Sequence, residues 1–228
     1  MKPGINQSHR CKKGRCCSEL PFIIRRKTDL ISLWKGNLET LESFRREHFS
    51  FIFQNNYLMP NLTAGENMML TLLMKGEQEE VALKKIKNLM KVVRLSEEVI
   101  DKSIYNVSGG QKQRLAFVRA IASPYEILVG DEPTGNLDAV TAQALMKFTR
   151  NAIISNDKAG IFVSHDINLA LKYADRIYIF TPKHNEEGLV GFLSSDQMLC
   201  LKKGNWTLRD RTIDNPMNYI QEAFEEII

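Results

Sequence analysis

Two carboxylates stand side by side at Asp131 and Glu132, directly after the short apolar run at residues 127–129. A continuous apolar run of this length is typical of a strand that is buried on both faces of a parallel sheet. Open α/β sheets bind their ligands at the carboxyl ends of such strands. A Mg²⁺ ligand beside a general base at that position predicts hydrolysis of a nucleoside triphosphate.

A second group with chemical potential begins upstream, where the sequence reads Ser108-Gly109-Gly110-Gln111. A serine is a preferred helix N-cap, and two glycines let the backbone approach a ligand closely. Free N–H groups at a helix N-terminus bind anions. Apolar residues follow at helical spacing, so one face of this helix is predicted to pack inward: Leu115, Val118, Ile121 and Ala122.

Two further polar side chains follow apolar runs. The run at 49–53 ends at Gln54, and the run at 160–164 ends at His165. Both runs predict buried strands, which would bring Gln54 and His165 to the same edge of the sheet as the carboxylate pair.

Aspartates mark the starts of the helices that follow two of these strands. Asp138 is predicted to cap a helix that begins after the carboxylate pair, and Asp166 to cap the helix after His165. The alternation of strands and helices predicts an α/β fold.

Taken in order, SGGQ, a following QR, DEPTGNLD and a downstream His165 resemble the motifs of ABC-type ATPases, the nucleotide-binding subunits of transporters. The stretches FRREHFSFIFQNNYLMPNLTAGENM and GDEPTGNLD are similar to the lipoprotein-releasing or macrolide-export type, over roughly residues 28–182. The resemblance implies a P-loop NTPase-like ABC ATPase core with an inserted helical subdomain, and an incomplete N-terminal part.

The resemblance also implies roles for the site residues and implies ATP and Mg²⁺ as cofactors. Asp131 would bind Mg²⁺ through water, and Glu132 would polarise the attacking water. His165 would contact the γ-phosphate and orient the base. Gln54 would reach both the metal and the water, which makes it a second metal ligand.

A head-to-tail dimer follows from the same resemblance. Residues 108–111 and Asp138 of one subunit would complete the nucleotide site of a second ATPase subunit. A separate transmembrane permease would be the other partner, and the apolar group at 57–59 either packs on its own domain or docks that partner. The implied location is peripheral, on the cytoplasmic face of the membrane.

One motif of the family is missing. A phosphate loop ends in Gly-Lys-Ser/Thr, and this sequence contains no Gly-Lys pair. Three lost hydrogen bonds to charged groups would remove about 4.5–9 kcal/mol, or roughly three to six decades of affinity. The isolated chain is therefore predicted to be weak or inactive as an ATPase.

Three explanations of this absence stay open at the level of sequence. The chain is a truncated, misassigned or frame-disrupted version of an ordinary ABC ATPase; or it is a catalytically impaired subunit that lends its SGGQ motif to a partner ATPase; or it serves as a regulator or scaffold.

Composition sets the remaining expectations. The first 27 residues contain eight basic residues against one acidic residue, but lack zinc-ligand spacing, and no aromatic residue lies among the basic residues at 10–15. Neither a metal site nor nucleic-acid binding is therefore expected there. No run of 18 apolar residues exists, so no transmembrane segment is predicted. Four cysteines do not make a disulfide scaffold, and a reducing, cytosolic setting is expected.

Three domains are predicted from these patterns. Residues 1–27 form an atypical basic leader in which disorder is expected, and residues 28–195 form the ABC ATPase domain. The helical subdomain lies at about 66–107. Residues 196–228 are predicted as a C-terminal extension of two helices around an irregular segment.

Overall fold

The computed structural model describes residues 36–185 and 188–225. The predicted leader at 1–27 and the following segment to residue 33, expected as a strand or loop, lie outside the described residues. The described chain falls into two compact units, which lie within Thr28–Tyr173 and Ala174–Ile228.

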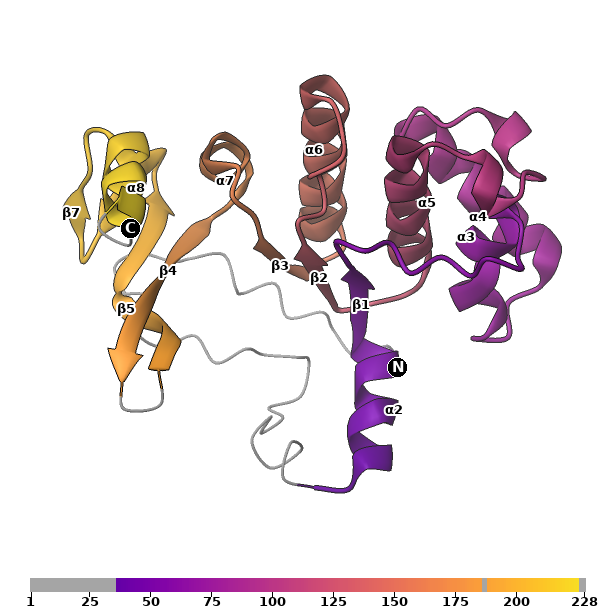
Figure 1. Ribbon diagram of the computed structural model, residues 1–228, viewed down its shortest axis with the longest axis horizontal. Coiled ribbons are helices and arrows are strands. Elements are labelled where there is room, and N and C mark those ends of the chain that lie inside the picture. The colour runs from indigo at the N-terminus through magenta and orange to yellow at the C-terminus, as the bar shows by residue number, and fades with distance from the viewer. Residues whose placement is uncertain (1–35, 186–187, 226–228) are drawn as a thin grey trace, which may run out of the picture. The chain divides into compact units, whose positions relative to one another are not determined.

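The first unit is built on a parallel sheet of three strands in the order β1-β2-β3. Strand β1 spans Phe49–Ile52, β2 spans Ile127–Asp131 and β3 spans Ala159–Val163. Ile52 pairs with Gly130, and Asp131 pairs with Val163. Because all three strands run in the same direction, their carboxyl ends lie at one edge of the sheet (Figure 1).

Burial differs between the central strand and the outer strands. Leu128 in β2 is fully buried, whereas Ile161 and Val163 in β3 are 41% and 61% exposed. Strands β1 and β3 each have only one neighbour in the described part of this sheet. The strands themselves are confirmed. The prediction of burial was wrong for β3, whereas β1 is partly buried and Ile52 is fully buried. An apolar run alone does not distinguish a central strand from an edge strand.

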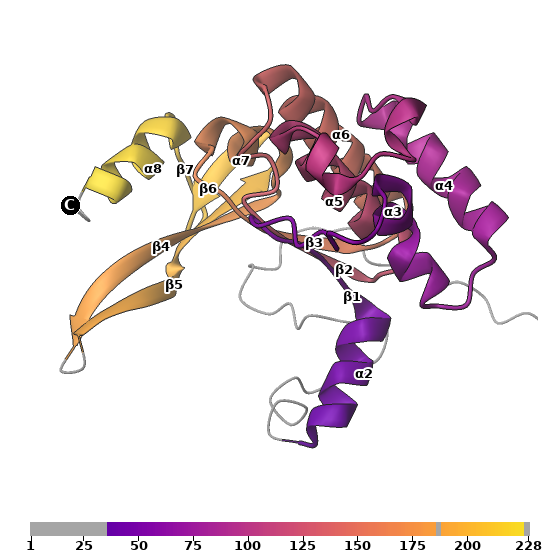
Figure 2. The same ribbon diagram turned by 45° about the vertical axis from the view of Figure 1, so that its right-hand side comes forward.

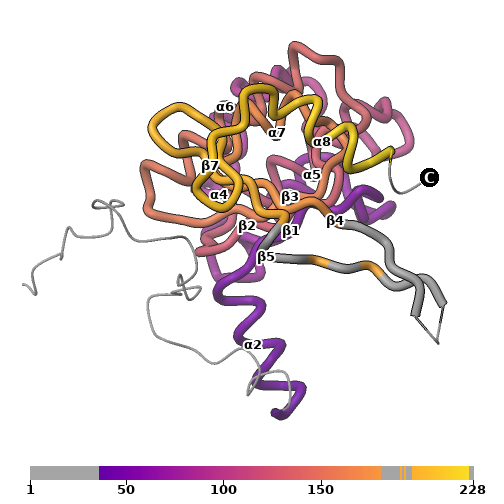
Figure 3. Tube along the Cα trace, turned by 90° about the vertical axis from the view of Figure 1, so that its left-hand side faces the viewer, coloured from indigo at the N-terminus to yellow at the C-terminus, as the bar shows by residue number. Residues whose placement is uncertain are grey.

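The helices of the first unit precede or follow these strands along the chain. The first unit contains α2 (Leu38–His48), α3 (Ala64–Leu73), α4 (Glu79–Val92), α5 (Gly109–Ala122), α6 (Ala139–Ser155) and α7 (Ile167–Tyr173), with short 3-10 helices at Glu97–Val99 and Ile104–Asn106. Helix α2 runs directly into β1 and projects away from the strands (Figure 3). Helix α5 packs on β1, where the Ser50 hydroxyl donates to the carbonyl of Ala120 at 2.7 Å.

The core of this unit lies where α3, α4 and α5 meet, at the right of Figure 1. Apolar side chains at helical spacing fill it: Met68, Leu72, Ile86, Met90, Leu115, Phe117 and Val118 are at most 1% exposed. Helix α3 begins with a capping box between Thr63 and Glu66, which satisfies N–H groups of its first turn. This packing fixes helix α5 and therefore the SGGQ motif at its start.

The second unit is an antiparallel sheet in the order β4-β5-β6-β7, followed by helix α8 (Pro216–Glu225). Its strands are β4 (Arg176–Asn185), β5 (Gly188–Lys202), β6 (Asn205–Leu208) and β7 (Arg211–Thr212). Strands β4 and β5 form the long ribbon in Figure 2. Among the described residues, no helix combines the length and apolar character needed to cross a membrane.

The prediction of two helices after residue 195 was right only for the second, which is α8. The first predicted helix lies in β5, and the segment predicted to be irregular contains β6 and β7. Lys203 and Gly204 both have positive φ, +49° and +86°. Two consecutive residues of this kind make the tight turn that best joins twisted antiparallel strands. Gly204, at the second position of this turn, was the available turn signal.

Candidate active site

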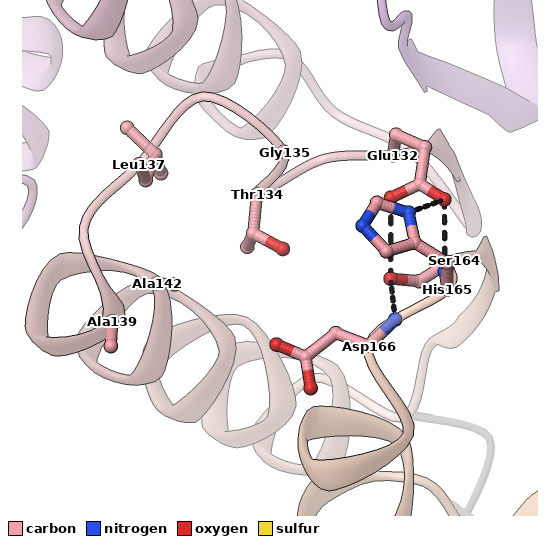
Figure 4. Close-up of a pocket in the computed structure, with 9 residues that line it drawn as sticks. All are labelled: Glu132, Thr134, Gly135, Leu137, Ala139, Ala142, Ser164, His165 and Asp166. Atoms are coloured by element: carbon pink, nitrogen blue, oxygen red, sulfur yellow. Dashed lines mark hydrogen bonds and ion pairs between the residues drawn. The ribbon is translucent and has the colours of Figure 1, made fainter.

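The carboxylate of Glu132 and the imidazole of His165 meet at the carboxyl ends of β2 and β3. His165 Nδ1 lies 2.8 Å from Glu132 Oε1, and the backbone N–H of His165 donates to the same oxygen at 2.9 Å (Figure 4). A carboxylate facing Nδ1 favours the tautomer that carries its proton there, which leaves Nε2 available to a ligand. The His165 side chain is 82% exposed and that of Glu132 is 16% exposed. The sequence predicted both residues at this edge, and the structure brings them together.

Ser164 is a third member of this cluster, and the sequence interpretation missed it. Its hydroxyl donates to Glu132 Oε2 at 3.4 Å and accepts the backbone N–H of Asp166 at 3.1 Å. Asp166 in turn accepts the backbone N–H of Leu169 at 2.9 Å, as expected of the cap of α7. These contacts fix the backbone on both sides of His165. The signal for Ser164 was its place between a strand and a predicted site histidine.

The backbone of Glu132 is strained. Its φ is +44°, a value that a residue with a side chain rarely adopts and that costs about 1–3 kcal/mol. Two backbone hydrogen bonds hold it: the Glu132 N–H donates to Val163 O at 2.9 Å, and the Gly135 N–H donates to Glu132 O at 3.2 Å. Strain that the surroundings maintain is typical of residues at functional sites.

A pocket of about 200 Å³ opens beside this cluster (Figure 4). Sites that enclose a whole small molecule measure about 300–1,000 Å³, so this pocket has room for part of a nucleotide, such as a terminal phosphate. The strand ends supply one wall and the start of α6 the other. Its lining residues are Glu132, Thr134, Gly135, Leu137, Ala139, Ala142, Ser164, His165 and Asp166.

Helix α5 begins with the predicted cap. The Ser108 hydroxyl accepts the Gln111 N–H at 3.3 Å, and Gln111 Oε1 accepts the Ser108 N–H at 2.8 Å. The N–H groups of Gly109 and Gly110 donate to no group in the part of the chain that the structure describes. A Cβ atom at Gly109 would meet nothing within 4 Å, so the backbone is open to a ligand. These residues fit an anion such as a nucleotide phosphate, whereas the Gln111 side chain is occupied by the cap.

Asp138 caps α6 as predicted, because its Oδ1 accepts the Thr141 N–H at 2.9 Å. Hydrogen bonds from the Thr141 side chain and then from the Thr141 backbone lower the pKa of the Asp138 carboxyl. The group is therefore ionised at neutral pH, and it lies next to the pocket wall formed by Ala139.

Gln54 and Asp131 lie at the same sheet edge without joining the cluster. Both are exposed, and within residues 36–185 and 188–225 neither side chain makes a hydrogen bond. Across those same ranges no group of three or more His, Cys, Asp or Glu side chains is arranged to hold a metal. Mg²⁺ is usually bound by one or two carboxylates together with phosphates and water, and a single exposed carboxylate at Asp131 fits that mode.

The loop after Gln54 is held rigidly by two residues that the sequence interpretation also missed. Arg119 donates to the carbonyls of Asn56 and Tyr57 at 2.7 and 2.8 Å. The buried Asn67 side chain accepts the Met59 N–H at 2.7 Å and donates to the Met59 carbonyl at 3.0 Å. Tyr57 and Met59 nevertheless remain 64% and 48% exposed. The loop thus presents apolar side chains from a fixed backbone.

Comparison with known proteins connects this geometry to a family. A model of the ABC transporter family matches residues 25–135. The lipoprotein-releasing system ATP-binding protein LolD of Colwellia psychrerythraea is 37% identical over 127 residues, which are 56% of this chain and 49% of LolD. The macrolide export ATP-binding/permease protein MacB of a Shewanella species is 34% identical over 139 residues, 61% of this chain and 21% of MacB. The chain spans about half the length of LolD and about a fifth of MacB.

The match to a third relative spans a larger share of that protein. The uncharacterised ABC transporter ATP-binding protein MJ0796 of Methanocaldococcus jannaschii is 35% identical over 162 residues, 68% of this chain and 67% of MJ0796. The solved dimeric structure of the MJ0796 cassette in a post-hydrolysis state, bound to ADP and Pi, matches with a TM-score of 0.59 and 33% identity, over 63% of this chain and 62% of the cassette. These matches confirm the α/β cassette fold and the resemblance to the lipoprotein-releasing and macrolide-export type. The chain belongs to the ABC transporter family of ATP-binding proteins.

Proposed function

We propose that this chain is an ATP-binding and ATP-hydrolysing subunit that powers a separate transmembrane permease. The observation that carries the proposal is the pairing of Glu132 with His165 at adjacent strand ends, with 2.8 Å between Oε1 and Nδ1. A carboxylate and an imidazole that share one small pocket can divide two tasks of phosphoryl transfer to water: one group activates the water and the other contacts the phosphate.

Each polar residue at the strand ends is given one role in ATP hydrolysis. His165 Nδ1 and the His165 backbone N–H occupy Oε1 of Glu132, so Oε2 is the oxygen directed at the attacking water. His165 Nε2 contacts the γ-phosphate, and Gln54 orients the water from the end of β1. Asp131 would hold Mg²⁺ through water, and the ion would supply positive charge that neutralises the phosphates.

The second half of each site comes from another subunit. The pocket at Glu132 has room for a terminal phosphate, and the open N–H groups of Gly109 and Gly110 fit a phosphate of their own. We propose that two ATPase subunits pair head to tail, so that residues 108–111 and Asp138 of one face the Glu132 pocket of the other. Backbone N–H groups aimed at the transferred phosphate would stabilise its charge in the transition state.

The permease is proposed to bind at the loop that carries Tyr57 and Met59. Apolar side chains exposed on a backbone fixed by Arg119 suit a protein partner, since little order is lost when they are buried. The chain would then lie on the cytoplasmic face of the membrane as a peripheral subunit. The cargo is set by the permease; the names of LolD and MacB specify lipoproteins and macrolides for those relatives.

A second candidate rests on one observation, the absence of a Gly-Lys pair from the sequence. In this alternative the chain is catalytically impaired and lends only its SGGQ motif to a partner that carries a phosphate loop. The first candidate is preferred because Glu132, His165 and Gln54 are all present, and the alternative gives them no task.

The test uses the purified chain and a partner ATPase with an intact phosphate loop. We expect negligible ATP hydrolysis by the chain alone, since it lacks the phosphate loop, and clear hydrolysis by the mixture. Ser108→Arg should abolish that gain, because it removes the cap and places a long side chain where the phosphate would bind. Both candidates predict this loss, whereas only the first predicts that Glu132→Gln abolishes the gain as well. A mixture no more active than the partner alone would refute the proposed function.

A further inference from the structure

Gln113 is fully buried in helix α5, yet its side chain is polar. Its Nε2 donates to the carbonyl of Pro133 at 2.9 Å and to that of Glu132 at 3.5 Å. Only the nitrogen of the amide group can face two carbonyl oxygens. The side chain therefore reaches from the SGGQ helix to the backbone immediately after the strand that carries Glu132.

The other half of this amide is unsatisfied. Gln113 Oε1 is buried and has no hydrogen-bond partner in the described part of the chain. A buried acceptor without a partner lowers stability, and an apolar side chain of the same length would avoid this cost. Packing alone therefore does not account for a glutamine here, whereas the donor contact to the two carbonyls does.

The group that Gln113 holds is the strained one. Glu132 has a φ of +44°, and the backbone must be kept in this conformation for the carboxylate to meet His165. The Glu132 N–H is anchored on Val163 of β3. On the other side the Glu132 carbonyl accepts the Gly135 N–H at 3.2 Å, and Gln113 adds a second anchor there, chiefly at the Pro133 carbonyl.

The same contact joins two parts of the chain that act in different sites. Gln113 is two residues beyond the cap formed by Ser108 and Gln111, and the start of α5 lies against the loop after Glu132: a Cβ atom at Gly110 would be 3.5 Å from Asn136 O. Displacement of the helix start is therefore transmitted to the loop through a buried hydrogen bond.

We propose that Gln113 is a positioning residue for Glu132. It holds the Glu132 backbone in its left-handed conformation and ties the geometry of the base to helix α5. The effect of Gln113 on the rate of ATP hydrolysis rests on the proposed function, whereas its effect on the Glu132 backbone does not.

The structural link is tested first, in the full chain without nucleotide, by hydrogen exchange. Gln113→Met keeps the length of the side chain and removes its donor, and Gln143→Met makes the same change at an exposed glutamine of α6. For Gln113→Met we expect amide exchange at residues 132–137 to accelerate about tenfold, with exchange in α5 and β2 and the melting temperature little changed. Gln143→Met should leave exchange in this loop as it is. Unchanged exchange in the loop of Gln113→Met, or equal acceleration throughout the chain, would overturn the proposal.

The catalytic consequence is tested in the mixture with a phosphate-loop-bearing partner. Gln113→Met should lower kcat roughly tenfold to a hundredfold with little change in KM, because a misplaced base slows chemistry more than it weakens binding. Gln113→Glu can donate only when its carboxyl is protonated, so its activity relative to wild type should rise as the pH falls. An unchanged kcat in Gln113→Met, or a fall in relative activity of Gln113→Glu toward acid, would contradict this. If the wild-type mixture does not hydrolyse ATP, the proposed function fails, and the exchange experiment alone decides the role of Gln113.

Discussion

Hydrogen bonds from neighbouring residues fix the orientation of the Glu132 carboxylate. Two N–H groups of His165 converge on one of its oxygens, and the Ser164 hydroxyl contacts the other. Preorganised contacts of this kind avoid reorganisation when charge develops in the transition state. The pair therefore acts as a unit, and removal of either member should disable it.

Replacement of His165 by alanine tests that dependence. Loss of the imidazole frees Oε1 and removes the proposed phosphate contact, so kcat of the reconstituted mixture should fall about a hundredfold or more. His48→Ala is the matched control, since His48 lies at the amino end of β1 beside Glu126, away from the strand tips. Equal kcat values for His165→Ala and His48→Ala, by steady-state ATPase assay, would rule out the assigned role.

The ionised cap at Asp138 gives a pH-dependent prediction. Hydrogen bonds from Thr141 lower the pKa of Asp138 in the folded state below the unfolded value of about 3.9. Its charge therefore stabilises the fold above that value, and the contribution is lost as the pH falls through the folded pKa. Asp138→Asn keeps a capping side chain without charge. Urea unfolding should find it less stable than wild type at pH 7, and the difference in the free energy of unfolding should shrink as the pH is lowered below about 3.9. A difference that does not change with pH would contradict the assignment.

At the scale of elements, helix α5 has two tasks that can be separated. Its first turn is capped by Ser108, and its N–H groups at Gly109 and Gly110 remain open. Capping contributes to stability whether or not a ligand binds, whereas the open N–H groups matter only to an anion.

Two substitutions at Ser108 separate these tasks. Ser108→Ala removes the cap and should lower the free energy of unfolding by about 1 kcal/mol. Ser108→Asp keeps a capping oxygen, so stability should stay close to wild type, but its negative charge should repel the phosphate and reduce ATP hydrolysis by the mixture. Urea titration and ATPase assay measure the two effects. Full activity in Ser108→Asp would mean that no phosphate binds at this helix start.

Local patterns predicted most of these elements, and tertiary context decided the rest. Periodic apolar residues predicted α5, and the apolar run at 127–129 predicted β2; both are present. The exposure of Val163 was not predictable, because it depends on how many neighbours β3 has. After residue 195 the second predicted helix is present as α8, but the first lies in β5. This strand depends on its pairing with β4 and on the turn at Lys203 and Gly204, and neither is specified by residues 196–202 alone.

The residues of the candidate site were also predicted only in part. Motif spacing predicted that Glu132 and His165 meet at the strand ends, because parallel strands deliver their carboxyl ends to one edge. Ser164 and Gln113 were missed, because their roles depend on hydrogen bonds to residues that are distant in the sequence. The sequence does contain one signal for Gln113. It is a polar residue on the same helix face as Phe117, at a position where an apolar residue is expected.

At the scale of the whole molecule, a single chain presents two incomplete sites. The Glu132 pocket is too small for a whole nucleotide, and the helix start at residues 108–111, proposed above to bind a phosphate, is a separate feature of the same chain. A head-to-tail pair would complete both kinds of site at once, and MJ0796, a relative at 35% identity, forms a dimeric cassette. On this proposal, catalysis belongs to the assembly, and Glu132 of this chain supplies the base.

The most direct measurement is the ATPase rate of the mixture when this chain carries Glu132→Gln, which keeps the size and hydrogen-bonding reach of the side chain but removes the base. The account predicts that the hydrolysis gained on mixing falls by about two orders of magnitude or more, while nucleotide-dependent association of the two subunits persists. Hydrolysis at the wild-type rate with Glu132→Gln, combined with its loss in Ser108→Arg, would contradict the account and leave this chain as the donor of an SGGQ motif alone.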